Sequence, residues 1–252
     1  MVVDSRDFSV APHLITKGEW EFGYTQYFRS LVRPESHILD CGANFGYYGL
    51  VSSTENPLGT VTFVEPNPLM VPFLRINSHL SGIENRSKIV DEAVLSEVSS
   101  INLNIPDDFW GSARLGDENN VKEIFRSAWG LDSTSFPVTT TTIDILAKDQ
   151  GHGFDVIKLD VEGSEEAALL GGLKTLDGAG RVDVFFEYSF GGPGRPLGAY
   201  SSDFWPFLLE TFQTLFLVKP DGSRIAVKEA QDLAQGGSTN YAMVHGITKG
   251  EK

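Results

Sequence analysis

The sequence predicts an α/β fold built on a mainly parallel sheet that is closed by an antiparallel edge. Short apolar or β-branched runs alternate with segments of helical period through most of the chain. Strands separated by helices join through right-handed crossovers, which gives parallel pairing. Near the end, the runs 215–219 and 225–228 are split only by an Asp-Gly turn, which favours a hairpin. Because no linker-like stretch divides the 252 residues, we expect a single domain over 1–252.

The first half of the chain predicts repeated strand–helix units after a helical lead-in over 1–35. The expected strands are 37–40, 60–65, 88–90 and, as a strand or hairpin arm, 99–105. We expect a helix over about 44–53, ended by turn residues. A second helix is expected where Leu69, Phe73, Ile76 and Leu80 recur at helical spacing. Pro72 then belongs in its first turn.

The second half predicts a continuation of the same sheet. The expected strands are 154–159, 182–187, 215–219, 225–228 and 240–245, and the expected helices are 121–128, 164–170 and 203–212. The segment 106–135 lacks clean strand signals, and 189–204 is rich in glycine and proline. We expect both to form loops on the substrate side, because long loops are often functional.

Composition narrows the function classes. Lys and Arg total 20 and Asp and Glu total 34, a net charge of −14, which disfavours phosphate-backbone binding and hence a nucleic-acid partner. The one cysteine, Cys41, excludes an intrachain disulfide and fits a reducing compartment. No stretch approaches 18 apolar residues and the start lacks an apolar signal core, so we expect a cytoplasmic protein without a membrane span.

The turn after the first expected strand is a candidate ligand site. Asp40 ends the strand, and Gly42 and Gly46 follow in a G-x-x-x-G spacing. This turn lacks the G-x-G-x-x-G of dinucleotide-binding enzymes and the Gly-Lys ending of a phosphate loop. Asp40 would repel a pyrophosphate and would suit an amino group. The alternative is an ordinary α/β turn in which Cys41 is a packing residue.

Carboxylates also end the next two strands. Glu65 is placed to accept hydrogen bonds from ribose hydroxyls, and Asp91 and Glu92 end the third strand, where an adenine would lie. Together these features suit an adenosine that carries an amino-acid tail and no phosphate, which describes S-adenosylmethionine. The alternative is that Glu65 is a solvated strand end.

Lys158, Asp160 and Glu162 form a third cluster, at the expected end of the strand 154–159. Their spacing of two places them on one face while the chain is extended. Asp160, Glu162 and, on the next strand, Glu187 are candidate bases for a hydroxyl, with Lys158 holding one of them ionised. The structural alternative is a buried ion pair with Glu162 capping the following helix. A Mg²⁺ site is a rival interpretation that we do not favour, because the strand end reads Glu187-Tyr188-Ser189 without an Asp-Asn pair.

These segments resemble the FkbM-type S-adenosylmethionine-dependent methyltransferases. The resemblance rests on four runs: Ile38–Tyr48, Phe63-Val64-Glu65-Pro66-Asn67-Pro68, Val156–Glu165 and Phe185-Phe186-Glu187. The K-x-D-x-E-G-x-E pattern within the third run is the most specific. Cys41 and Ser164 are minor departures from the pattern. The resemblance implies a class I methyltransferase sheet (Rossmann-like) of seven strands with an antiparallel last strand and helices on both faces.

The resemblance also implies methyl transfer from S-adenosylmethionine, most often to a hydroxyl of a sugar, glycan or secondary metabolite. The cofactor-binding residues that we expect are Asp40, Gly42, Ala43, Asn44, Gly46, Tyr47, Glu65, Asn67, Asp91, Glu92 and Ala93. The catalytic candidates are Lys158, Asp160, Glu162 and Glu187, and no metal ligands are expected. The substrate-side candidates are Trp110, Ser112, Arg114 and Tyr188.

The segment Trp20–Phe28, which contains Glu21 and Tyr24, is a further candidate cover of the donor site. Two other functions compete with methyl transfer. A non-catalytic binding module would keep the fold without the chemistry, but Asp40, Glu65 and Asp160 are all present. A nicotinamide-dependent oxidoreductase is disfavoured by the missing G-x-G-x-x-G.

Overall fold

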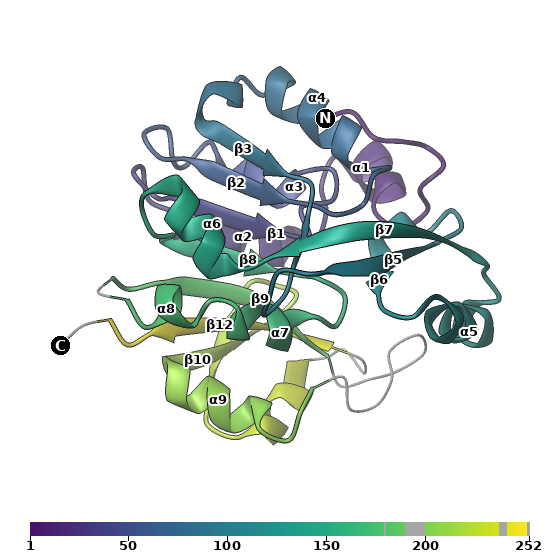
Figure 1. The fold of residues 1–252 in the computed structure, drawn as a ribbon. Coiled ribbons are helices and arrows are strands. Elements are labelled where there is room, and N and C mark those ends of the chain that lie inside the picture. Colours follow the sequence, from purple (N-terminus) through teal and green to yellow (C-terminus); the bar gives the residue numbers. More distant parts are fainter. Residues whose placement is uncertain (179, 190–199, 237–240, 251–252) are drawn as a thin grey trace.

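The computed structural model describes residues 1–178, 180–189, 200–236 and 241–250, and its centre is an eight-stranded sheet (Figure 1). The strand order is β11-β10-β12-β9-β8-β1-β2-β3. The strands are β1 (Ile38–Cys41), β2 (Val61–Val64), β3 (Ser87–Val90), β8 (Val156–Leu159), β9 (Asp183–Ser189), β10 (Phe212–Val218), β11 (Arg224–Val227) and β12 (Tyr241–Thr248). From β3 to β9 every neighbouring pair is parallel, whereas β12 is antiparallel to both β9 and β10.

This sheet confirms the predicted α/β class and its antiparallel last strand, with one strand more than the seven that the family resemblance implies. The eighth strand is β11, which matches the expected strand 225–228 and pairs antiparallel with β10 at the edge of the sheet. The two strands are joined through Asp221 and Gly222, and Gly222 has a φ of +82°. A left-handed glycine is what such a tight reversal favours.

Helices cover both faces of the sheet and create two separate cores (Figure 1). One face carries α2 (Phe22–Leu31), α3 (Tyr47–Ser52) and α4 (Val71–Leu80), and the other carries α6 (Ile143–Gln150), α7 (Glu165–Leu170), α8 (Leu173–Leu176) and α9 (Phe204–Thr211). Two adjacent residues of β9 show how the sheet separates the two cores. Phe185 packs with the first group and Phe186 with the second, because successive strand side chains point to opposite faces.

Two helices begin where local backbone geometry permits. The expected helix over 44–53 begins only at Tyr47, because Asn44 (φ +54°) and Gly46 (φ +88°) are left-handed. α4 begins at Val71 with Pro72 in its first turn, as predicted.

A second sheet extends to one side of the first. Its order is β4 (Ala93–Val94), β7 (Ser133–Thr141), β5 (Ser100–Pro106) and β6 (Arg114–Leu115), and α5 (Glu118–Trp129) lies beside it (Figure 1). The segment 106–135, expected to be a loop apart from a helix over 121–128, contains that helix as α5 and also β6 and the start of β7. The sequence did not predict β7 or α6. β7 is mostly Ser and Thr and most of its residues are partly exposed, so it lacks the apolar alternation of a half-buried strand.

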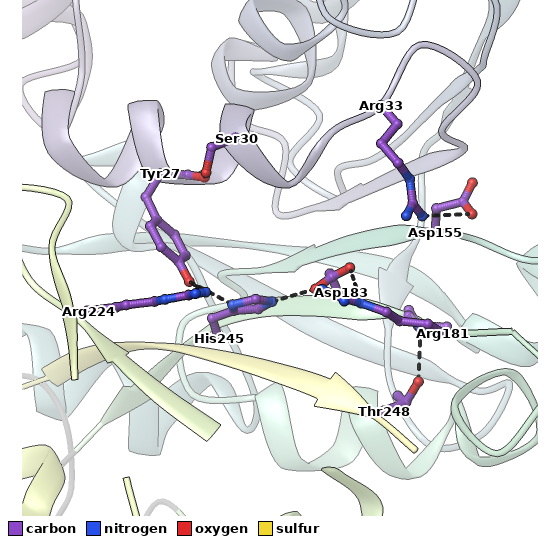
Figure 2. Close-up of polar contacts among 10 residues, drawn as sticks. Tyr27, Ser30, Arg33, Asp155, Arg181, Asp183, Arg224, His245 and Thr248 are labelled. Carbon is purple, nitrogen blue, oxygen red and sulfur yellow. Dashed lines mark hydrogen bonds and ion pairs between the residues drawn. The ribbon is translucent and has the colours of Figure 1, made fainter. Parts of the chain in front are cut away.

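A buried polar chain joins α2 to the sheet (Figure 2). His245 on β12 is fully buried; its Nε2 lies 2.8 Å from Asp183 Oδ1 and its Nδ1 lies 2.8 Å from the hydroxyl of Tyr27. Arg224 donates a hydrogen bond to the Tyr27 hydroxyl, and Arg181 donates two to Asp183. The network fixes the middle of α2 over β9 and β12.

Two of the expected segments are described only in part. Residues 190–199 of the expected loop 189–204, and Asn240 of the expected last strand, lie outside the described residues. Within the described residues, no helix is long and apolar enough to cross a membrane. α1 (Ala11–Lys17) and α2 occupy the segment expected to be a helical lead-in.

Candidate active site

A cavity lies at the carboxyl ends of β1, β2 and β8, the edge of a parallel sheet where α/β proteins bind ligands. Its lining comes from those strand ends, from the N-terminal segment and from the segment after β5. The lining residues include Ser9, Val10, Trp20, Gly42, Ala43, Asn44, Tyr47, Tyr48, Glu65, Glu92, Ala93, Phe109, Trp110, Gly111, Ser112, Lys158, Asp160 and Glu162.

The turn after β1 forms the floor and requires glycine at one position. Gly42 has a φ of +71°, and a Cβ built on it would lie 1.8 Å from the backbone oxygen of Asp160. The turns after β1 and β8 therefore touch backbone to backbone. Any larger residue at Gly42 would separate them.

Glu65 lies in the cavity wall at the end of β2. Its Oε1 accepts a hydrogen bond from the Asn67 amide (2.8 Å) and its Oε2 accepts one from the Asn44 amide (2.7 Å). Burial raises the pKa of Glu65 to about 7, against the two amides, which favour the ionised form. This is a preorganised carboxyl with acceptor capacity left for hydroxyl donors, as a ribose would supply.

Lys158 joins the two turns from beneath. Its Nζ lies 3.4 Å from Asp160 Oδ2 and 3.6 Å from Asp40 Oδ1, and it donates a hydrogen bond to the Gly42 carbonyl at 3.1 Å. Burial raises the pKa of Asp40, whereas the charge of Lys158 opposes that rise. Burial alone would lower the pKa of Lys158, but Asp160 and Asp40 hold it above its usual range. Asp40 is fully buried and does not line the cavity, so the cation that it faces is Lys158.

The turn after β8 is held by a carboxylate that the helix itself contributes. Glu165 Oε1 accepts from the amides of Val161 (3.0 Å) and Gly163 (3.2 Å), and its Oε2 accepts from the Tyr200 hydroxyl. Glu162 is not the cap of α7, which begins at Glu165. Glu162 is left-handed (φ +56°), and its carboxylate lies 3.7 Å from Arg114. A strained non-glycine residue beside a cavity is a common feature of functional sites.

The N-terminal segment and the segment after β5 together form the roof. Asp7 is fully buried and accepts hydrogen bonds from the amides of Trp110, Val10 and Ala11. Ser9 Oγ accepts from the Gly111 amide at 2.9 Å. Asp7, Ser9 and Val10 were not predicted from the sequence. An Asp shortly before a helix that carries a proline in its first turn is an available signal.

The predicted residues divide into those that line the cavity and those that do not. Those that line it are Gly42, Ala43, Asn44, Tyr47, Glu65, Glu92, Ala93, Trp110, Ser112, Lys158, Asp160 and Glu162. Those placed elsewhere in the structure are Asp40, Gly46, Asn67, Asp91, Arg114, Glu187 and Tyr188.

Each residue of the second group has another environment. Asn67 supports Glu65, and Arg114 pairs with Glu162. Asp91 is exposed and pairs with Arg75 on α4. Tyr188 packs against Tyr200 and Phe204.

The remaining three are also explained by their surroundings. Gly46 directly precedes α3, Asp40 faces Lys158, and Glu187 is buried within β9. Among the residues that the structure describes, no group of three or more His, Cys, Asp or Glu side chains is arranged to hold a metal ion.

The chain is similar to known methyltransferases. The sequence model of the methyltransferase FkbM domain matches residues 40–213. A curated relative from Streptomyces tacrolimicus, 31-O-demethyl-FK506 methyltransferase FkbM, is 25% identical over 185 residues, 62% of this chain and 70% of that protein.

One solved structure shows the same fold. The methyltransferase FkbM of Methylobacillus flagellatus has a TM-score of 0.51 at 15% identity, over 88% of this chain and 47% of that chain. This chain therefore spans about half the length of that structure. An O-methyltransferase from Bacillus cereus, solved with SAH, has a TM-score of 0.48 at 13% identity, over 98% and 84% of the two chains. The chain belongs to the FkbM family of S-adenosylmethionine-dependent methyltransferases.

Proposed function

We propose that this methyltransferase transfers its methyl group to a hydroxyl oxygen of a small molecule, namely a sugar, a glycan or a secondary metabolite. The observation that carries the proposal is the pairing of two carboxylates, Asp160 and Glu162, with aromatic walls in one cavity. A hydroxyl must lose its proton as it is methylated, so a nearby carboxylate assists the reaction. The name of the Streptomyces relative, a methyltransferase for 31-O-demethyl-FK506, supports oxygen as the receiving atom.

In this proposal the floor and the β2 end of the cavity bind the donor. Glu65 accepts hydrogen bonds from the ribose hydroxyls, and the turn over 42–44 lies beneath the methionine end. Glu92 and Ala93 lie at the adenine end. S-adenosylmethionine supplies an electrophilic methyl group on a sulfonium. The protein contributes chiefly by orienting donor and acceptor, which lowers the entropic part of the barrier.

The acceptor in this proposal enters beneath the roof. Trp110 and Ser112 line the cavity together with Asp160 and Glu162. Aromatic faces with a few polar groups suit the ring of a sugar or a macrocycle. The acidic strand ends favour an uncharged acceptor over a carboxylate or phosphate, because like charges repel at short range.

The first test is a calorimetric titration with S-adenosylmethionine and S-adenosylhomocysteine. We expect both to bind the wild-type protein. Glu65→Ala removes the ribose acceptor, and losing hydrogen bonds to a charged group lowers affinity by about tenfold or more. Glu123→Ala, an exposed change on α5 away from the cavity, is the matched control and should bind like the wild type.

The outcomes separate the donor site from the acceptor. Equal affinity in Glu65→Ala and wild type would show that the ribose assignment is wrong. Absence of binding in the wild type would favour a non-catalytic module. With the donor bound, a screen of hydroxylated acceptors that includes sugars, oligosaccharides and macrolides tests oxygen methylation directly.

A further inference from the structure

Glu21 is a carboxyl beside the cavity that none of the assignments above uses. It directly precedes α2, its φ is +47°, and its side chain does not cap that helix. Although the residue is partly exposed, its carboxylate turns inward and accepts a hydrogen bond from the Tyr48 hydroxyl at 2.8 Å. A glutamate that adopts a strained backbone without capping its helix is a candidate for a functional role.

The surrounding elements fix Glu21 in this position. Within the first turn of α2, a Cβ on Gly23 would lie 2.0 Å from the Pro220 carbonyl, so the start of the helix sits directly on the β10–β11 turn. Further along α2, Tyr27 is bonded to His245, as Figure 2 shows. Trp20, which precedes Glu21, and Tyr48, which donates a hydrogen bond to it, both line the cavity, whereas Glu21 lies directly behind them and is not itself among the lining residues.

The charged groups facing Glu21 are those of the acceptor side. Asp160 and Glu162 after β8, and Lys158 on it, act on the charge of Glu21, as Tyr48 of α3 does through its hydrogen bond. On α2 itself, burial and the charge of Glu21 together raise the pKa of Tyr24. Lys158 Nζ also lies 5.1 Å from the centre of the Tyr48 ring. Glu21 therefore belongs to the cluster at the end of β8, although it is distant in sequence.

The three carboxyls of this cluster differ in their partners. Asp160 lies 3.4 Å from Lys158, and Glu162 lies 3.7 Å from Arg114. Glu21 has a neutral partner, the hydroxyl of Tyr48. Burial, together with repulsion by Asp160, raises the pKa of Glu21 from 4.5 to about 7. A carboxylate paired with a cation is a weak base, whereas one that ionises near neutral pH suits proton transfer.

We infer that Glu21 is the base of the methyl transfer, contacting the acceptor hydroxyl opposite the transferred methyl group. The inference rests on the proposed function. The acceptor oxygen bonds to the methyl carbon as the carbon–sulfur bond breaks, and the electron pair of that bond stays on sulfur. The hydroxyl proton passes to the carboxylate of Glu21. Asp160 and Glu162 then orient the acceptor, and Tyr48 positions Glu21.

The test uses two donor analogues and needs no acceptor. Sinefungin carries a protonated amine where S-adenosylmethionine carries the sulfonium methyl, so its ammonium points toward the base. S-adenosylhomocysteine lacks any group there. The ratio of their affinities, measured by calorimetry at pH 6 and pH 8, reports whether the sinefungin ammonium contacts the carboxylate of Glu21. The variants are Glu21→Gln and, as a matched control two residues away, Glu19→Gln.

We expect the wild-type preference for sinefungin to increase from pH 6 to pH 8 as Glu21 ionises. Glu21→Gln should lower that preference at pH 8 by about tenfold, the size of one charge-assisted hydrogen bond, and remove its pH dependence. Its affinity for S-adenosylhomocysteine should stay at the wild-type value, which shows that the variant is folded. Glu19→Gln should behave like the wild type.

Two results would overturn the inference, and they are distinguishable. If Glu21→Gln keeps both the preference and its pH dependence, another carboxyl faces the methyl group and only the role of Glu21 is wrong. If the wild type binds neither analogue, the donor site itself is wrong, and the proposed function fails together with this inference.

Discussion

Lys158 shows how a single residue sets the electrostatics of the whole site. It is buried between Asp40, which is fully buried, and Asp160, which lines the cavity. An ion pair out of water gains little net stability, but removing one partner leaves an uncompensated charge. Lys158 also holds the Gly42 carbonyl, so the same ammonium neutralises two carboxylates and joins the turns after β1 and β8.

Replacing this ammonium should therefore destabilise the protein strongly. We expect Lys158→Met to lower the free energy of unfolding by about 3–5 kcal/mol. The control is Lys122→Met, which removes a partly exposed pair with Asp132 and should cost less than about 1 kcal/mol. Urea unfolding measures both changes.

The pH dependence of Lys158→Met tests the cause of that loss. Without Lys158, the pKa of Asp40 rises further above its value in the unfolded chain. A carboxyl with a raised pKa stabilises the fold at low pH, and that stability disappears as pH rises. The deficit should therefore be larger at pH 8 than at pH 5. An equal deficit at both pH values would indicate lost packing instead of an unpaired charge.

The site residues that the sequence predicted and those that it did not differ in how far along the chain their contacts reach. Glu65 directly follows β2 and Lys158 lies near the end of β8, both in a recognisable pattern, and both line the cavity. Asp7 and Ser9 reach it only because the N-terminal segment folds back onto Trp110, a contact across about a hundred residues. Such a contact has no local pattern. Asp40 was predicted to face a ligand, but the depth of its burial depends on packing that sequence alone does not specify.

Among the elements, prediction succeeded where apolar burial decides the structure. β1, β2 and β8 are buried along their whole length, and their apolar runs were evident. β7 was missed because its stability comes from a long antiparallel ladder with β5, in which Ser and Thr suffice. α6 is short, and Thr142 caps it by accepting from the Ile145 amide at 3.1 Å. Its eight residues give too little periodicity to stand out.

The roof depends on the carboxylate of Asp7, which joins α1 to the segment after β5. Asp7 Oδ2 accepts hydrogen bonds from the amides at the start of α1, and its Oδ1 accepts one from the Trp110 amide at 3.1 Å. Asp7→Ala would leave these buried amides without their acceptor, at a cost of about 1–3 kcal/mol in the free energy of unfolding. Because Trp110 lines the cavity, we also expect weaker binding of S-adenosylhomocysteine.

Unfolding and calorimetry together test the role of Asp7. Asp4→Ala, which removes a pair with the largely exposed Arg6, is the control and should leave the affinity unchanged. Asp7→Ala that binds S-adenosylhomocysteine as tightly as the wild type, under conditions where it is folded, would show that the roof does not need Asp7.

At the scale of the molecule, the fold gathers carboxyls at one edge of the sheet. Parallel strands bring their carboxyl ends together, so Asp40, Glu65 and Asp160 meet although they are far apart in sequence. The N-terminal segment adds Glu21 to the same edge. In a chain of net charge −14, this concentration of acidic groups favours a cationic ligand such as a sulfonium and stores unfavourable energy when no ligand is bound.

That stored energy should appear as a pH dependence of stability in the absence of donor. The pKa values of Glu21 and Glu65 are both raised from 4.5 to about 7, chiefly by burial. A raised pKa means that the folded protein holds protons that the unfolded chain releases. The stabilisation is complete below the unfolded value and is lost as pH rises to about 7, so the free energy of unfolding should fall between about pH 5 and pH 8.

Urea unfolding of the wild type and of a Glu21→Gln, Glu65→Gln double variant across this range isolates the two groups. The pKa of His37 is lowered by burial, which works in the opposite direction, but it is common to both proteins and cancels in the difference. Because glutamine cannot ionise, the double variant should gain stability relative to the wild type as pH rises. A difference that stays constant from pH 5 to pH 8 would mean that neither carboxyl is held protonated by the fold, and that the acidic edge is solvated before the donor binds.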